Sequence, residues 1–162
     1  MNRSDEIEAL YVAHRGEIYA YLVGLGLEPA VAQELTQEVY VRLIEELDGR
    51  SVRNHRAWLF RAAHNLAIDE HRSRSRASEL PTAEYDHPKS PEDPEQLAMQ
   101  RQKERTLMLA IRQLSPQQLA CLQLRSNGLR YREIAEVLGI SVPTVGEFLQ
   151  RAIKNMRKLL YG

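Results

Sequence analysis

The sequence predicts an all-α protein made of two small helical domains joined by a flexible linker, the C-terminal domain containing a helix-turn-helix. Apolar residues recur at three- and four-residue spacing along most of the chain, as on one face of a helix. No stretch shows the strict alternation that is typical of a strand. A run with several prolines and acids and few apolar residues, 78–93, separates two helical parts, so the expected domains are residues 1–77 and 94–162.

Three helices are expected in the first domain. The first covers residues 7–23 and ends at Gly24 and Gly26. The second begins at Pro29, because proline is tolerated in the first turn of a helix. A loop over residues 48–54 then leads to a third helix from about 55 to 76. The apolar face of the second helix consists of Leu35, Val39, Leu43 and Leu47.

Two helix starts open the second domain. Asp93 and Ser115 each precede a proline, and a glutamine follows each of them three residues later. This arrangement is typical of a capped helix N-terminus. Cys121 lies in the apolar run LACLQL and is expected to be a buried thiol.

The segment 131–149, YREIAEVLGISVPTVGEFL, predicts the helix-turn-helix. Ala135 suits a close approach of two helices, and Gly139 suits a left-handed turn. Ser141 can cap the second helix, whose first turn tolerates Pro143. The shared core is expected to consist of Ile134, Leu138, Ile140, Val145 and Phe148. A plain helical hairpin is the alternative, and agreement at so many positions argues against it.

Composition excludes several other classes of protein. A chain of 162 residues can hold one or two small domains. A single cysteine allows no internal disulfide, and no apolar run approaches the length needed to span a membrane. No secretory signal pattern opens the sequence. We therefore expect a cytoplasmic protein without membrane insertion.

The net charge of zero hides a segregation of charges. Residues 1–47 carry three Arg/Lys against nine Asp/Glu, and residues 48–76 carry seven against three. Residues 77–100 carry one against six, and residues 101–162 carry eleven against four. The two basic blocks are candidate nucleic-acid surfaces, although ordinary solvated helix faces would also fit this pattern.

Three stretches, in this order, make the chain resemble an extracytoplasmic-function (ECF) sigma factor of the sigma-70 family. AVAQELTQEVYVRLIEEL (30–47) resembles the helix that docks on core RNA polymerase. RAWLFRAAHNLAIDEHRSRSR (56–76) resembles the helix that recognises the minus-10 element and melts the promoter. LSPQQLACLQLRSNGLRYREIAEVLGISVPTV (114–145) resembles the minus-35 recognition domain. The resemblance implies core RNA polymerase and promoter DNA as partners, and an anti-sigma factor as a regulator.

The resemblance also implies which residues bind. Core-polymerase docking would use Glu34, Leu35, Gln37, Glu38 and Tyr40. Minus-10 DNA would be contacted by Arg53, Asn54, His55, Arg61, Asn65 and Arg72. Minus-35 DNA would be contacted by Arg130, Arg132, Ser141, Pro143, Thr144, Glu147, Gln150, Arg151 and Lys154. Trp58 could stack on DNA, but we favour a core position for it.

The recognition helix departs from the family pattern at two positions. Gly146 and Phe148 occupy places that are usually basic in the family, with Glu147 between them. Glycine weakens a helix by about 1 kcal/mol relative to alanine. A glutamate facing DNA can accept a hydrogen bond from a cytosine amino group. Phe148 would be either a core residue or an exposed contact to another protein.

Three alternatives to a sigma factor can be weighed. A stand-alone helix-turn-helix regulator would need a dimer to gain affinity, and an adaptor would use the same helices only for protein contacts. A metallohydrolase is the third, because His64, Asp69, Glu70 and His71 cluster in sequence. The two histidines are seven residues apart, wider than the usual i, i+4 pair for one zinc ion. We therefore expect no metal, no cofactor, no small-molecule substrate and no enzymatic activity.

Overall fold

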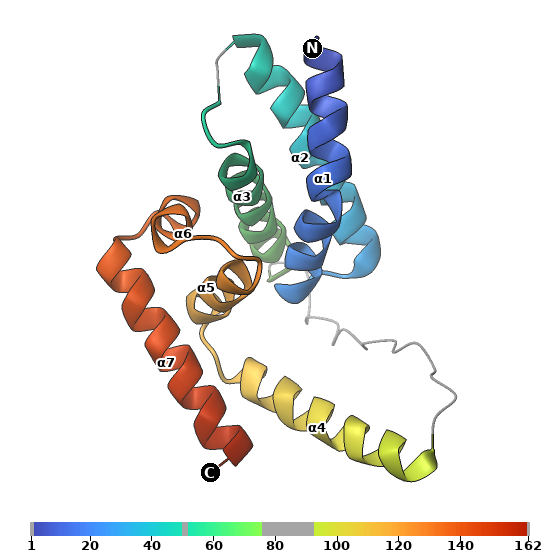
Figure 1. The fold of residues 1–162 in the computed structure, drawn as a ribbon, viewed down its shortest axis with the longest axis vertical. Helices are drawn as coiled ribbons and strands as arrows, with labels where there is room; N and C mark the ends of the chain where they lie inside the picture. The colour runs from blue at the N-terminus through green and yellow to red at the C-terminus, as the bar shows by residue number, and fades with distance from the viewer. Residues whose placement is uncertain (1, 50–51, 76–92, 162) are drawn as a thin grey trace.

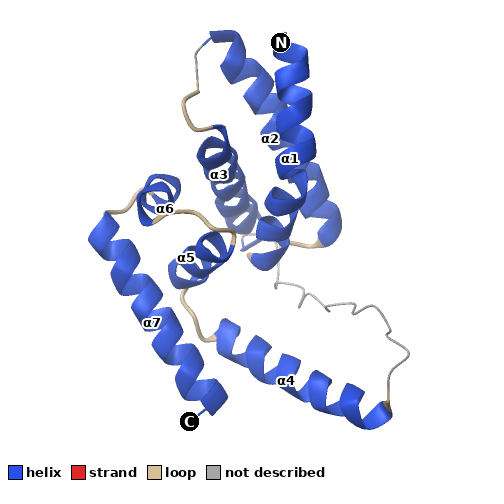
Figure 2. Cartoon of the chain, viewed as in Figure 1, coloured by secondary structure: helices blue, strands red, loops and turns tan. Residues whose placement is uncertain are grey.

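The computed structural model describes residues 2–49, 52–75 and 93–161. Over these ranges every regular element is a helix, which confirms the all-α prediction (Figures 1 and 2). The helices are α1 Arg3–Gly24, α2 Pro29–Gly49, α3 His55–Ser75, α4 Pro94–Arg112, α5 Pro116–Ser126, α6 Tyr131–Leu138 and α7 Val142–Tyr161. Apart from Asp93, the predicted linker 78–93 and the adjoining residues 76–77 lie outside the described residues.

Helices α1, α2 and α3 pack against one another and form the N-terminal region (Figure 1). The rings of Tyr21 and Phe60 meet edge to face at 5.5 Å in its core. Two boundaries differ from the prediction. Helix α1 begins at Arg3 because the Asn2 side chain caps it, accepting a hydrogen bond from Asp5 N at 2.9 Å. Helix α2 continues to Gly49, so the loop predicted to begin at Asp48 is shorter.

Helices α4 to α7 form the C-terminal region, and caps determine where α4 and α5 begin. The Asp93 side chain accepts a hydrogen bond from Glu95 N at 3.3 Å. Ser115 Oγ accepts from Gln118 N at 3.1 Å, and Gln118 Oε1 accepts from Ser115 N at 3.2 Å. This reciprocal pair is the capping box that the sequence predicts at α5.

Helices α6 and α7 form the predicted helix-turn-helix. Gly139 ends α6 in the left-handed conformation with φ 67°, as the turn requires. The Ser141 hydroxyl accepts a hydrogen bond from Thr144 N at 3.3 Å and so caps α7. Ile134 and Val145 are fully buried between the two helices. Leu138, Ile140 and Phe148 are partly buried against the same core, as expected.

The two regions pack against each other. Helix α6 lies against α3, and α5 lies beside α1 (Figure 1). One cluster of buried side chains continues from Tyr21 and Phe60 in the N-terminal region to Cys121 and Leu124 in the C-terminal region. Cys121 is buried, as the apolar run around it predicts. Within the described ranges, no helix is apolar over a stretch long enough to cross a bilayer.

Candidate functional site

Helix α2 has an exposed face with both polar and apolar side chains. Glu34, Gln37 and Glu38 are exposed on it. Gln37 Nε2 donates a hydrogen bond to the Tyr11 hydroxyl at 3.1 Å. Val41 and Ile44 are 48% and 43% exposed on the same side of the helix. An apolar patch beside carboxylates is suited to contact with another protein.

The other two expected docking residues have different surroundings. Tyr40 is only 5% exposed, and its hydroxyl donates a hydrogen bond to Leu10 O at 3.2 Å. Leu35 is partly buried against the core. Both side chains therefore support α2 from within the bundle. Val41 and Ile44 were not predicted from the sequence. The available signal was that both are apolar but fall outside the inward-facing stripe of Leu35, Val39, Leu43 and Leu47.

Helix α3 gathers three of the expected minus-10 residues on one exposed face. Arg61, Asn65 and Arg72 are exposed, and their spacing of four and seven residues places them along one side of the helix. Arg74, two residues beyond Arg72, pairs with Glu70 at 3.0 Å. Trp58 packs partly buried against the core, which agrees with the expected core position.

The remaining expected minus-10 residues lie just before α3 and at its first position. Arg53 is exposed, and His55 Nε2 lies 3.3 Å from Glu6 Oε1. Asn54 caps α3, because its Oδ1 accepts a hydrogen bond from Ala57 N at 3.1 Å. The Asn54 amide group also donates to Glu133 Oε2 at 2.9 Å, so it contacts the C-terminal region. The sequence gives no signal of that contact.

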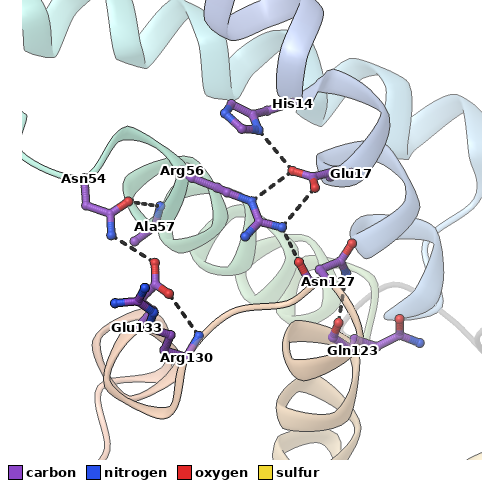
Figure 3. A network of polar contacts seen from close by, with 9 residues as sticks. All are labelled: His14, Glu17, Asn54, Arg56, Ala57, Gln123, Asn127, Arg130 and Glu133. Atoms are coloured by element: carbon purple, nitrogen blue, oxygen red, sulfur yellow. Dashed lines mark hydrogen bonds and ion pairs between the residues drawn. The ribbon is translucent and has the colours of Figure 1, made fainter.

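Arg56 is held by its own region. Its Nε and Nη2 donate to the two carboxylate oxygens of Glu17 at 3.1 and 2.9 Å (Figure 3). Burial opposes ionisation of Glu17, but Arg56 and His14 outweigh it and hold the pKa of that carboxyl below its usual value. A bidentate pair of this kind orients the guanidinium firmly.

Helix α7 and its N-terminal turn present a continuous face to solvent. Pro143, Thr144, Glu147, Gln150, Arg151 and Lys154 lie on one side of α7 by helical spacing. All of these except Thr144 are exposed, as are Ser141, Arg130 and Arg132. Such a face on the second helix of a helix-turn-helix is the part that enters the major groove of DNA.

The surroundings of the two unusual positions in α7 differ. A Cβ atom at Gly146 would lie 3.9 Å from a ring carbon of Tyr131, an ordinary van der Waals contact, so the packing there does not require glycine. Phe148 is partly buried against the core. Of its two expected roles, the core role fits this position.

The histidines of α3 take part in structural contacts. His64 Nδ1 and the Tyr21 hydroxyl are 2.8 Å apart and share a hydrogen bond. His71 Nε2 lies 3.0 Å from Leu25 O. Among the described residues, no three His, Cys, Asp or Glu side chains come together as metal ligands.

Exposed faces on three helices, one of them the second helix of a helix-turn-helix, are typical of a helical DNA-binding protein. Comparison with known families agrees with this class. Residues 10–77 match the model of sigma-70 region 2, and residues 104–156 match that of sigma-70 region 4.

Three curated relatives are similar over nearly the whole chain. The RNA polymerase sigma factor YlaC of Bacillus subtilis is 32% identical, over 98% of this chain and 94% of YlaC. The ECF sigma factor SigL of Mycobacterium tuberculosis is 32% identical, over 95% of this chain and 88% of SigL. BldN of Streptomyces coelicolor is 29% identical, and the match covers 97% of this chain but only 61% of BldN.

A solved structure of the sigma factor RpoE from Bartonella quintana, in complex with the anti-sigma factor NepR, has a similar fold. The TM-score is 0.77 at 19% identity, with 96% of each chain covered. The chain belongs to the ECF sigma factors of the sigma-70 family. Members of this family are transcription initiation factors and not enzymes.

Proposed function

We propose that this protein docks on core RNA polymerase through α2 and directs it to promoters through α3 and α7. The observation that carries the proposal is the separation of the three candidate sets on three helix faces. Polar and apolar side chains are exposed on α2, arginines on α3, and a mixed polar face on α7. On this proposal, residues 1–77 act in docking and minus-10 recognition, and residues 94–162 act in minus-35 recognition.

Docking would use both kinds of side chain on α2. Glu34, Gln37 and Glu38 supply charge and hydrogen bonds, and Val41 and Ile44 supply apolar area. Interfaces commonly combine an apolar centre with a polar rim, and the charges improve selectivity and the rate of encounter. Tyr40 and Leu35 would contribute by fixing the position of α2 on α1.

Promoter opening would depend on α3 and the segment before it. Arg61 and Arg72 can contact phosphates, and Asn65 adds a hydrogen-bonding group on the same face. Arg53 and Asn54 precede this helix and His55 begins it, and all three would contact a base that has left the duplex. Unstacking a base is costly, so a protein that opens DNA must bind the exposed base.

Minus-35 recognition would depend on α7 in the major groove. Arg130, Arg132, Arg151 and Lys154 can bind phosphates, which positions the helix without reading sequence. Ser141, Thr144, Glu147 and Gln150 can read base edges, and Pro143 can contact a thymine methyl group. With Gly146 and Glu147 at its centre, this face would prefer a sequence that offers a cytosine amino group.

Membership of the family supports proposals about a regulatory partner and a cellular location. RpoE, which shares the fold, was solved in complex with an anti-sigma factor. We propose that an anti-sigma factor also controls this protein. We further propose that this protein acts in the cytoplasm, where core polymerase and promoters are found.

Reconstituted transcription is the direct test. Core polymerase, with and without this protein, would transcribe a genomic fragment library, and the 5′ ends of the RNA would be sequenced. New start sites that share two spaced upstream elements are the expected result. Tight binding of the protein alone to a palindromic fragment, with no new starts, would instead favour a stand-alone regulator.

A further inference from the structure

Glu147 occupies the centre of the face that α7 presents to solvent. The buried residues of α7 form one stripe along the inner side of the helix: Val145, Leu149 and Ala152. At 3.6 residues per turn, Glu147 projects from the side opposite this stripe, and Gln150 and Arg151 flank it. Helix α7 runs along the outer edge of the C-terminal region (Figure 1). Glu147 therefore points toward the base edges when the first turns of α7 enter the major groove.

The hydroxyl groups at the start of α7 already have partners within the protein. Ser141 Oγ and Thr144 Oγ1 lie 2.7 Å apart and share a hydrogen bond, and Ser141 Oγ also accepts from Thr144 N at 3.3 Å. In contrast, the Glu147 carboxylate and the Gln150 amide make no hydrogen bond or ion pair to another side chain in the part of the chain that the structure describes. These two side chains therefore bring polar groups without a protein partner to the DNA.

The charge of Glu147 is not neutralised by its neighbours. Gly146 and Phe148 stand on either side of it in the sequence, so neither supplies a cation. Arg151, one turn further along α7, is exposed and forms no ion pair with the Glu147 carboxylate. A full negative charge at the centre of this face repels the phosphates of every DNA sequence.

Only an amino group on a base edge can compensate a carboxylate that loses water in the major groove. Cytosine presents its N4 amino group there and no acceptor of its own. Adenine also has an amino group, but its N7 acceptor lies beside it, and thymine and guanine present acceptor oxygens. A cytosine is therefore the base that best accommodates a glutamate, and thymine or guanine at the same place leaves the charge unpaired.

We propose that Glu147 selects the base at one position of the minus-35 element by repulsion. It lowers the affinity for all DNA and is compensated only where a cytosine N4 amino group faces it. The side chain thus raises selectivity and lowers affinity. This inference rests on the proposed function, because it assigns a base preference to the α7 face.

Glu147→Gln tests the proposal, because it keeps the size of the side chain, removes the charge and adds a donor. Holoenzyme reconstituted with each protein would transcribe a responsive promoter whose minus-35 element is randomised and barcoded, and the RNA would be sequenced. The unmodified protein should favour cytosine over thymine at one position about tenfold. Glu147→Gln should reduce this preference to about twofold or less and should raise initiation from templates without that cytosine several-fold.

Glu136→Gln is the matched control. It removes the same charge from an exposed position of α6, in the same helix-turn-helix, and should keep the cytosine preference. Gln150→Ala is a second control, because three residues advance a helix by about 4.5 Å, close to one base-pair step. It should change the preference at a neighbouring position and leave the cytosine position unchanged.

A template with N4-methylcytosine at the selected position tests the contact itself. In the paired base the methyl group replaces the N–H that faces the major groove. The unmodified protein should initiate about tenfold less from this template than from the cytosine template. Glu147→Ala, whose side chain does not reach the base, should initiate equally from both.

Three results would overturn the assignment: equal base profiles for Glu147→Gln and the unmodified protein, loss of the cytosine preference in Glu136→Gln, or equal sensitivity of Glu147→Ala to the methylated template. Failure of the proposed function would look different, because no template would then be transcribed with any of these proteins. That result would overturn this inference as well.

Discussion

One partly buried histidine, His64, makes the stability of the N-terminal region depend on pH. It shares a hydrogen bond with the Tyr21 hydroxyl, and burial lowers its pKa from 6.5 to about 4. Between pH 6.5 and about 4, the His64 ring is therefore protonated in the unfolded chain but neutral in the folded chain. Stability from the neutral ring is complete above pH 6.5 and is lost as the pH falls toward 4. We expect a loss of about 2 kcal/mol between pH 7 and pH 5, measured by urea unfolding.

The control for this prediction is His64→Gln, which keeps a hydrogen-bonding group beside Tyr21 but does not titrate. Its free energy of unfolding should be lower at pH 7 but should change much less between pH 7 and pH 5. If both proteins lose the same stability over this interval, then other groups cause the dependence.

A second residue, Gly146, permits a stabilising change. It lies inside α7, and a Cβ there would be in ordinary contact with the Tyr131 ring at 3.9 Å. Gly146→Ala should therefore raise the free energy of unfolding by about 0.5–1 kcal/mol, because alanine loses less backbone entropy in a helix. Denaturant unfolding, with Gly16→Ala on α1 as the reference, measures the change. Destabilisation would mean that Tyr131 needs the open space.

At the scale of elements, helical spacing predicts faces well but does not predict their partners. Capping at Ser115 and the turn at Gly139 follow from local chemistry, so the sequence predicted both correctly. The exposed faces of α3 and α7 follow from spacing alone. Tyr40 could not be placed in this way, because its burial depends on Leu10 and Tyr11 of another helix.

The face of α3 supports a prediction about promoter opening. Arg61→Glu with Arg72→Glu replaces two positive charges by negative ones along a single exposed face. Promoter opening, monitored by permanganate footprinting, should be lost because the new carboxylates repel the DNA phosphates. Co-purification with core polymerase should persist. Arg101→Glu with Arg105→Glu makes the same charge change on exposed positions of α4 and should leave opening intact. Loss of both activities in the α3 variant would assign this helix to docking or folding.

The face of α2 supports the opposite prediction. Glu38 is exposed, one turn from Val41, and carries one of the charges in the proposed docking face. Glu38→Lys should weaken co-purification with core polymerase at least tenfold, because truncating or reversing an interfacial charge leaves its partner unpaired. Binding to single-stranded DNA should be retained. Glu8→Lys, the same reversal at an exposed position of α1, should leave both activities unchanged.

At the scale of the whole molecule, the sequence does not reveal that the two regions pack together. Asn54 and Glu133 are 79 residues apart, and each already has a local explanation as a cap residue. Cys121 is correctly predicted to be buried, but its surroundings include the N-terminal region, which no local pattern indicates. Long-range contacts of this kind depend on complementary surfaces, and spacing within one helix carries no information about them.

The effect of salt distinguishes two physical accounts of what holds the two regions together. Blocks of opposite charge, nine Asp/Glu against three Arg/Lys in residues 1–47 and eleven Arg/Lys against four Asp/Glu in residues 101–162, could attract each other over a distance. The contact itself, however, consists of a buried apolar core and short hydrogen bonds. The Debye screening length falls to about 3 Å at 1 M salt. Added salt therefore abolishes the long-range attraction between the charged blocks but not the packed contact.

We therefore expect labelling of the Cys121 thiol by a maleimide to remain slow between 0.1 and 1 M sodium chloride, because this thiol is buried in the core that the two regions share. Affinity for single-stranded DNA should fall steeply over the same range, because phosphate contacts release counterions. Labelling of the unmodified protein that accelerates with salt would show that attraction between the charged blocks, and not the packed interface, holds the regions together.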